Sequence, residues 1–441
     1  MTLLIISPDY ASHLYPLATL GTAWAEAGER VVVASGPATA GIVADFGFER
    51  ENLQLGRGSN PGTIRAEQQP AGEDDALRGF FDATRRGMVP TLLFQAEARS
   101  SDLLYNPVVI AREVQRIVAL VQPDHIIVDH LAFSARLGLL GAGVPYADVV
   151  LGHPSALPLG PEVYGYPPAW PAVFSPSPNE LSLLELQCEV VRDSFTALWN
   201  DALMELNPAL PRSSDAFGEY GDLLLLNYPE ELHSPARTSA LPPHVFLGSA
   251  VRSESVDPQV ETWLAQDSRS VVYVSFGSFL SVRGDVLARV VAALRTLPVR
   301  VAIATGATEA AALGQIPDSW LVRDFLPQVR LLQEASLVVT HGGNNSVTEA
   351  MTAGVPLVVL PFSTDQFAGA AAIDAAGFGV SLPPNTADVL ELRTACERML
   401  HLAGEPRIRL DALAVSLTLQ PGRARAYAAL TRERVAVLSG A

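Results

Sequence analysis

The chain contains no lysine. Its 30 basic residues are all arginines, against 47 acidic residues, which gives a net charge of −17 over 441 residues. The absence of lysine excludes Schiff-base aldolases, lysine-anchored pyridoxal phosphate enzymes and P-loop proteins. The acidic balance argues against binding to nucleic acid or to an anionic membrane surface. An all-arginine basic set is also typical of GC-rich coding genomes, which suggests a bacterial source.

Cysteine is scarce, and long uninterrupted apolar runs are missing. Cys188 and Cys396 form no CxxC motif, so the sequence predicts two buried thiols rather than disulfides or a zinc site. The apolar start of the chain lacks a basic region and a cleavage site, which indicates a buried strand rather than a signal peptide. The apolar stretch after Phe133 is interrupted by Arg136, too soon to span a bilayer. We therefore expect a soluble, cytoplasmic protein.

The hydrophobic pattern predicts two α/β domains. Hydrophobic residues make up 49% of the chain, and 441 residues exceed one ordinary core. Apolar strands alternate with amphipathic helices, which is typical of parallel sheets covered on both faces. The first series of expected strands comprises 3–6, 31–34, 126–128, 149–151 and 223–226, and the second comprises 271–275, 299–304, 337–340 and 357–360. We therefore predict two doubly wound domains in tandem.

Two proline-rich segments interrupt this alternation. The segment 246–262 separates the two series of strands, so we predict a linker there between domains at 1–245 and 263–420. The second segment has eight prolines between Pro154 and Pro178, with aromatic residues among them. It is either a binding loop or a surface excursion packed by its own aromatic side chains.

The most informative stretch is THGGNNSVTEAMTAGVPLVVLPFSTDQ, residues 340–366. A strand-like run ends in two glycines, two asparagines and a serine before a helix begins. Such a junction directs backbone N–H groups and the positive end of a helix dipole at its ligand, and therefore favours an anion. Ser346 and Glu349 also fit a capping box, which is the simpler interpretation of that pair taken alone.

Together with the residues before it, this stretch resembles the C-terminal signature of family 1 nucleotide-sugar-dependent glycosyltransferases, which include plant small-molecule and bacterial natural-product enzymes. The shared features are Pro327–Gln328, the HxGxNS motif from His341 to Ser346, Glu349, Gly354–Pro356 and Asp365–Gln366. The resemblance implies the GT-B fold, in which two Rossmann-like domains face each other across a cleft. It further implies an N-terminal acceptor domain, a C-terminal donor domain and a final helix, 421–441, that returns to the N-terminal domain.

The resemblance also implies a site for the diphosphate of a nucleotide sugar, held by neutral hydrogen-bond donors without lysine. Glu349 would bind the ribose hydroxyls, Phe325 would stack on the base, and Asp365 with Gln366 would bind the sugar. The other donor-binding residues would be Gly277, Ser278, Gln328, His341, Gly343, Asn345 and Ser346. The carboxylate of Glu349 favours a UDP-sugar over a dTDP-sugar, because deoxyribose lacks the 2′-hydroxyl. Gln366 favours glucose.

Near the N-terminus, residues 5–35 resemble the opening strand, loop and helix of the same family. His13 would be the general base that deprotonates an acceptor hydroxyl. Asp129, at the end of a predicted strand, would hold the other ring nitrogen and stabilise the imidazolium. Asp124 lies at the wrong edge of the sheet, and His130 is expected to point the other way because side chains alternate along a strand.

The acceptor is expected to be a hydrophobic small molecule with a hydroxyl group. The candidate acceptor-binding residues are Phe80, Phe81, Phe94, Phe133, Tyr164 and Trp170. Core packing is the commoner role for any one such aromatic side chain.

The prediction that follows is an inverting O-glycosyltransferase that moves a hexose, with glucose favoured, from a UDP-sugar as co-substrate. The chain has no Asp-x-Asp motif, so we expect neither a metal nor a cofactor. We expect a monomer or weak dimer that binds neither nucleic acid nor membrane. The alternatives are a dTDP-deoxysugar-dependent antibiotic glycosyltransferase, a UDP-sugar epimerase of similar architecture and a non-catalytic helper subunit.

Overall fold

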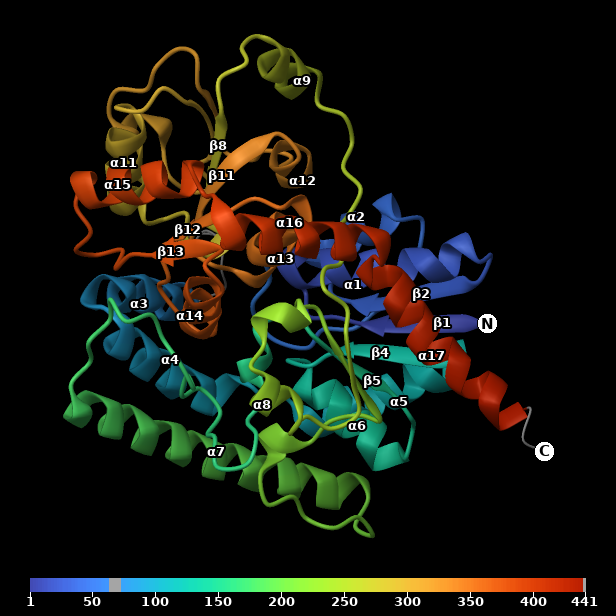
Figure 1. The fold of residues 1–441 in the computed structure, drawn as a ribbon. Coiled ribbons are helices and arrows are strands. Elements are labelled where there is room, and N and C mark those ends of the chain that lie inside the picture. The colour runs from blue at the N-terminus through green and yellow to red at the C-terminus, as the bar shows by residue number, and fades with distance from the viewer. Residues whose placement is uncertain (63–72, 439–441) are drawn as a thin grey trace.

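Two parallel sheets organise residues 1–62 and 73–438, which are the residues that the computed structural model describes (Figure 1). The first sheet has seven strands in the order β3-β2-β1-β4-β5-β6-β7, and the second has six in the order β10-β9-β8-β11-β12-β13. We refer to the parts built on them as the N-terminal and C-terminal domains. The predicted fold class, two doubly wound α/β domains, is confirmed.

The elements of the N-terminal domain are β1 (Thr2–Ile6), α1 (Ala11–Glu26), β2 (Arg30–Ser35), α2 (Ala40–Asp45), β3 (Glu49–Asn52), α3 (Glu73–Arg86), α4 (Met88–Asp102), α5 (Pro107–Val121), β4 (His125–Asp129), α6 (Phe133–Ala142), β5 (Ala147–Val150), α7 (Pro178–Leu206), β6 (Leu223–Leu226), α8 (Pro235–Thr238) and β7 (His244–Phe246). Those of the C-terminal part are α9 (Pro258–Ala265), β8 (Val271–Ser275), α10 (Gly277–Leu280), α11 (Gly284–Leu294), β9 (Arg300–Ala304), β10 (Leu321–Arg323), α12 (Gln328–Leu332), β11 (Ala335–Thr340), α13 (Asn344–Ala353), β12 (Leu357–Val359), α14 (Gln366–Ala376), β13 (Gly379–Ser381), α15 (Val389–Leu400), α16 (Gly404–Leu419) and α17 (Gly422–Leu438).

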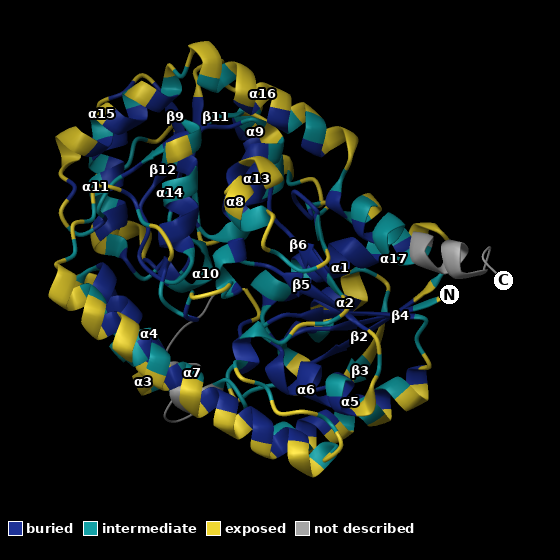
Figure 2. Cartoon of the chain, turned by 60° about the horizontal axis from the view of Figure 1, so that its bottom comes forward, coloured by how far each residue is buried: buried dark blue, intermediate teal, exposed yellow. Residues whose placement is uncertain are grey.

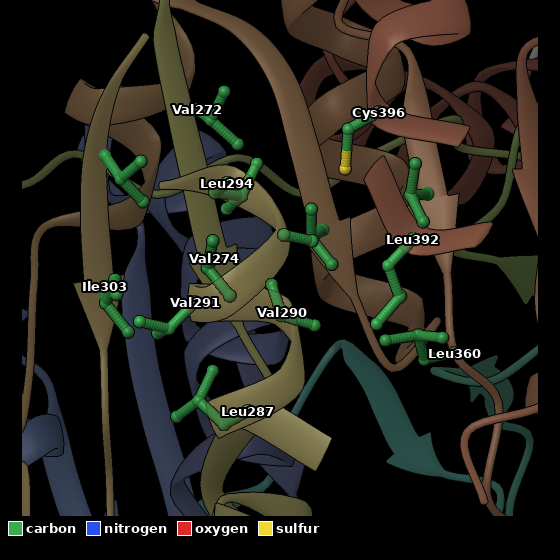
Figure 3. Packing of buried hydrophobic residues seen from close by; sticks show 14 of the residues in the cluster. Val272, Val274, Leu287, Val290, Val291, Leu294, Ile303, Leu360, Leu392 and Cys396 are labelled. Carbon is green, nitrogen blue, oxygen red and sulfur yellow. The ribbon is translucent and has the colours of Figure 1, made fainter. Parts of the chain in front are cut away.

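The central strands are buried, β4 and β8 along their whole length and β1 from Leu3 on, as the dark ribbons of Figure 2 show. The helices that cover them present one apolar face each. On α11 that face consists of Leu287, Val290, Val291 and Leu294, spaced as neighbouring turns of a helix require. These side chains belong to the same buried cluster as Val272 and Val274 on β8 (Figure 3). Burial of such apolar faces stabilises each domain around its own sheet.

Each sheet has a switch point, where two neighbouring strands have their connecting helices on opposite sides. In the N-terminal domain β1 pairs with β4, and in the C-terminal domain β8 pairs with β11. The carboxyl ends of these strand pairs carry the segments that begin after Ile6, Asp129, Ser275 and Thr340. Crevices at such points are where open α/β sheets bind ligands.

The structure refines several expected boundaries. Helix α1 begins at Ala11, so His13 lies inside its first turn. Helix α9 begins inside the expected linker and continues past its end, and its Val260 and Trp263 pack into the core of the C-terminal domain. Helix α17 packs against α1 (Figure 1). In this contact the ring of Tyr427 lies edge-on to that of Trp24. The final residues of the expected segment 421–441 lie outside the described ones.

The proline-rich segment 154–178 contains one short 3-10 turn, Pro154–Ala156, before α7 begins. Val163 and Tyr164 are buried in an aromatic cluster, and Tyr166 borders the cavity described below. Both interpretations of this segment therefore hold in part, since it packs on its own aromatics and also borders the cavity. Among residues 1–62 and 73–438, no helix combines the length and the apolar character needed to cross a membrane.

Candidate active site

A cavity of about 720 Å³ is lined by residues of both domains. It lies at the carboxyl ends of the switch-point strands, where His13, in the first turn of α1, borders it from the N-terminal domain and His341, which follows β11, borders it from the C-terminal domain. The predicted donor-binding residues that border it are Gly277, Ser278, Phe325, Gln328, His341, Gly343, Asn345, Ser346, Asp365 and Gln366. The structure thus brings these ten predicted donor-binding residues together around one cavity.

The predicted catalytic pair is formed across the first switch point. Nδ1 of His13 lies 2.6 Å from Oδ2 of the fully buried Asp129, whose other oxygen accepts the backbone N–H of Leu131. Burial by itself lowers the pKa of His13, but the charge and hydrogen bond of Asp129, with the charge of Asp365, raise it above its ordinary value. Burial likewise raises the pKa of Asp129, and the interaction with His13 outweighs it and lowers that pKa. His13 can therefore accept a proton from a ligand, and Asp129 stabilises the imidazolium that results.

His130 does not point away from the site as expected. Its Nδ1 lies 4.0 Å from Oδ1 of Asp129, and the residue borders the cavity. The expectation was wrong because Asp129 is the last residue of β4, and alternation holds only inside a strand. Burial lowers the pKa of His130 to about 4, so the ring is neutral at neutral pH. Neither ring nitrogen has a hydrogen-bond partner among the described residues.

The ring of His341 lies between two glycines. A Cβ built on Gly277 would come within 2.8 Å of its Cε1, and one built on Gly343 would come within 2.4 Å of its Nε2. Gly277 and Gly342 also have φ values of +68° and +85°, which other residues rarely adopt. Burial lowers the pKa of His341 to about 4, against a hydrogen bond with the backbone of Ser275. His341 therefore acts as a neutral hydrogen-bonding group.

The capping-box interpretation of Ser346 and Glu349 is wrong. Helix α13 begins at Asn344 with Gly343 as its N-cap, and no side chain caps it. Its first backbone N–H groups thus face the cavity without a competing side-chain acceptor, which is the arrangement that suits an anionic ligand. The box fails because the helix starts three residues earlier than the motif supposes, with its N-cap at Gly343 instead of Ser346.

The carboxylate of Glu349 is buried and does not border the cavity. Its Oε1 accepts a hydrogen bond from Arg252 at 3.1 Å, and its Oε2 accepts one from Nε2 of Gln328 at 2.6 Å. Burial raises the pKa of Glu349, while Arg252 and Gln328 oppose that shift. Arg252 and Gln328, rather than Glu349, therefore form the surface of the cavity at this point.

Asp365 and Gln366 are both engaged with the protein. Oδ2 of Asp365 accepts the backbone N–H of His153 at 2.5 Å, across the two domains. Gln366 accepts the backbone N–H groups of Phe362 and Ser363 and so braces the loop that precedes α14. Asp365 also contributes to the raised pKa of His13, and both residues border the cavity.

The donor-side loops contact the N-terminal domain directly. Nδ2 of Asn345 donates to the carbonyl of Ser12 at 2.9 Å, and Nδ2 of Asn60 donates to Oγ of Ser278 at 3.1 Å. The carbonyl of Ser12 precedes the predicted base in sequence. These contacts set the distance between the two walls of the cavity.

The aromatic candidates divide into two groups. Phe325 is 67% exposed, which suits a stacking surface, and Phe80, Phe94 and Tyr164 border the cavity. The other three were wrong as acceptor contacts, because they do not border it: Phe81, Phe133 and Trp170. Phe133 is buried edge-on to the rings of an aromatic cluster beside α7, and Trp170 packs on the same cluster. Phe81 packs beside Phe80.

The motif did not indicate Arg252, which is the sole arginine among the described residues that border the cavity. Arg252 lies in the predicted linker, where no periodicity or motif marks it. Among the described residues, no group of three or more His, Cys, Asp or Glu side chains is arranged to hold a metal ion.

Known proteins share both the C-terminal sequence and the whole fold. Residues 288–415 match the family model described as erythromycin biosynthesis protein CIII-like, C-terminal domain. The NDP-glycosyltransferase YjiC of Bacillus subtilis (strain 168) is 34% identical over 133 residues, which are 30% of this chain and 34% of that protein. The demethyllactenocin mycarosyltransferase of Streptomyces fradiae is 33% identical over 159 residues, 36% of this chain and 34% of that protein. The chain thus aligns with about a third of the length of these relatives.

Solved glycosyltransferases share the architecture over nearly the full chain. The calicheamicin glycosyltransferase CalG4 has a TM-score of 0.65 at 20% identity and covers 96% of both chains. The glycosyltransferase VinC, solved in complex with DTDP, has a TM-score of 0.67 at 18% identity and covers 98% of this chain and 99% of that one. The chain therefore has the GT-B fold. The resemblance to family 1 nucleotide-sugar-dependent glycosyltransferases is confirmed.

Proposed function

We propose that the protein is an inverting O-glycosyltransferase that moves a hexose, glucose by preference, from a UDP-sugar to a hydroxyl of a hydrophobic small molecule. The observation that carries the proposal is that His13, whose Nδ1 lies 2.6 Å from the buried Asp129, borders the same cavity as the glycine-flanked His341 and the start of α13. A base and an anion site on opposite walls are what a direct displacement at a sugar–diphosphate bond requires.

In the proposed reaction His13 takes the proton of the acceptor hydroxyl on its Nε2, since Nδ1 faces Asp129. The acceptor oxygen forms a bond to the anomeric carbon while the bond from that carbon to the diphosphate breaks. The nucleoside diphosphate leaves with the electron pair. The N–H groups at the start of α13 and the neutral ring of His341 stabilise the negative charge that develops on the diphosphate, without a metal or a lysine. One displacement on an α-linked donor gives a β-glycoside.

A second donor remains a specific candidate. The Streptomyces fradiae relative is named as a mycarosyltransferase, and VinC is described in complex with DTDP. A dTDP-deoxysugar would use the same base and the same anion site, and would differ at the ribose and the sugar. Relative affinity for the two nucleotides separates these candidates.

The test is the change in thermal unfolding temperature on adding UDP and, separately, dTDP. A ligand that binds only the folded protein, at about a hundred times its dissociation constant, adds roughly 2.7 kcal/mol to the free energy of unfolding. A larger shift with UDP supports the proposed donor, and a larger shift with dTDP supports the second candidate. If neither nucleotide shifts the transition, the proposed donor site is wrong. Turnover of UDP-glucose without any acceptor alcohol, giving a second UDP-sugar, would indicate an epimerase.

A further inference from the structure

The wall of the cavity beside α13 is built differently from what the sequence motif implies. The carboxylate of Glu349 is covered, and the polar groups that reach the cavity there belong to Arg252 and Gln328. Each of the two donates one hydrogen bond to a different oxygen of Glu349. One buried anion thus fixes the positions of two cavity-lining side chains.

Arg252 is held from several sides. Its Nη1 donates to Glu349 and its Nη2 donates to Glu254 at 2.6 Å, while its guanidinium lies 5.2 Å from the ring centre of Tyr15 on α1. The side chain retains 15% exposure, at the cavity. A guanidinium has five N–H groups, so donors remain for a ligand after these two bonds. Since its charge is shared by two carboxylates, Arg252 adds no net positive charge to the site.

We propose that Arg252 is a nucleotide-binding residue that selects ribose over deoxyribose. In this arrangement the 2′-hydroxyl of the bound nucleotide accepts a hydrogen bond from Arg252 and lies against Gln328. Glu349 acts through them as a positioning residue rather than as the direct ligand of the sugar. The inference rests on the proposed function, because it takes a nucleoside diphosphate as the ligand of this cavity.

A site built to bond a hydroxyl rejects the analogue that lacks it, because a buried polar group is then left without a partner. UDP and 2′-deoxy-UDP differ only in that hydroxyl, so the ratio of their dissociation constants measures the contact directly. A general loss of charge or of structure would change both constants together. The ratio therefore separates ribose recognition from a merely structural role.

The experiment is calorimetric titration of UDP and 2′-deoxy-UDP into the unaltered protein, Arg252→Gln, Arg252→Lys and the control Arg393→Gln. Arg393 makes an ion pair with Glu397 on the surface of α15 and does not border the cavity. We expect the unaltered protein and the control to prefer UDP roughly tenfold, as one hydrogen bond to a charged group provides. Arg252→Gln should bind both nucleotides equally. Arg252→Lys should show an intermediate ratio, because it keeps the charge but loses the fork of donors.

The inference is overturned if Arg252→Gln keeps the preference for UDP, if it weakens both nucleotides by the same factor, or if the unaltered protein shows no preference. Should Arg252→Gln fail to fold by thermal unfolding, the ratio of Arg252→Lys decides the question, and an unchanged ratio refutes the inference. Failure of the proposed function looks different, because then the unaltered protein binds neither nucleotide.

Discussion

Replacement of Asp129 by asparagine removes the charge opposite His13 with the smallest change in shape. The charge centres of a carboxylate and an imidazolium in direct contact lie about 4 Å apart, and at an effective dielectric constant of about 20 their interaction is about 4 kcal/mol. The nitrogen–oxygen distance of 2.6 Å and the complete burial of Asp129 justify treating the contact as direct. At 1.36 kcal/mol per decade of rate, we expect kcat to fall by up to about a thousandfold. Donor affinity should not change, because Asp129 is fully buried against His13 and does not border the cavity.

The assay is the initial rate of UDP release from UDP-glucose with a panel of phenols as acceptors, measured across pH. In the unaltered protein the rate should rise with pH through a value above 6.5, because the base must be neutral and its pKa is raised. In Asp129→Asn this limb should shift to lower pH, since Asp129 is the main cause of the raised pKa. Asp124→Asn is the matched control, because Asp124 lies at the other end of β4, where it accepts the backbone N–H of Thr2. Less than a threefold loss of kcat in Asp129→Asn would refute the reasoning.

Two further predictions concern donor binding and acid stability. Gly343→Ala should weaken UDP binding by roughly tenfold or more, because the added Cβ would displace the ring of His341. The control Gly41→Ala on α2 should leave UDP binding unchanged, because the added Cβ meets nothing within 4 Å. Equal titration curves for the two variants would contradict this prediction. Burial lowers the pKa of His130 to about 4 and that of His153 to about 3, so below about pH 6.5 the unfolded chain binds more protons than the folded one. The free energy of unfolding should therefore fall as pH drops from about 6.5 toward 4, by ~1.4 kcal/mol per pH unit for each of these histidines. Denaturant titrations at pH 7, 6 and 5 check the sign, and a constant value between pH 7 and 5 would count against it.

The proposed catalytic pair shows how far local patterns can predict position. His13 and Asp129 are 116 residues apart, yet their contact follows from two expected strands whose carboxyl ends meet at the same edge of a parallel sheet. The donor motif behaves similarly, since each of its parts follows a strand of the second sheet or begins a helix beside it. The positions of these residues could be predicted because apolar periodicity reveals each strand locally, and the parallel pairing of strands brings their carboxyl ends to the same edge of the sheet.

Other contacts depend on packing that no local pattern encodes. Arg252 and Glu349 are 97 residues apart and meet only because the linker passes over α13. An aromatic residue in a core and one beside a cavity look alike in sequence, so Phe133 and Phe94 could not be separated before the side chains were placed.

The sequence by itself therefore determined the two sheets, the strand ends that carry the site and the residue types available for an anion and a base. Hydrophobic alternation and glycine at special backbone angles are sufficient for that, because each acts within a few residues. Only the tertiary structure decided which polar groups reach the cavity. There Glu349 is buried and supports Arg252 instead of facing a ligand, and Arg252 borders the cavity, because burial and ion pairing depend on elements that are far apart in the chain.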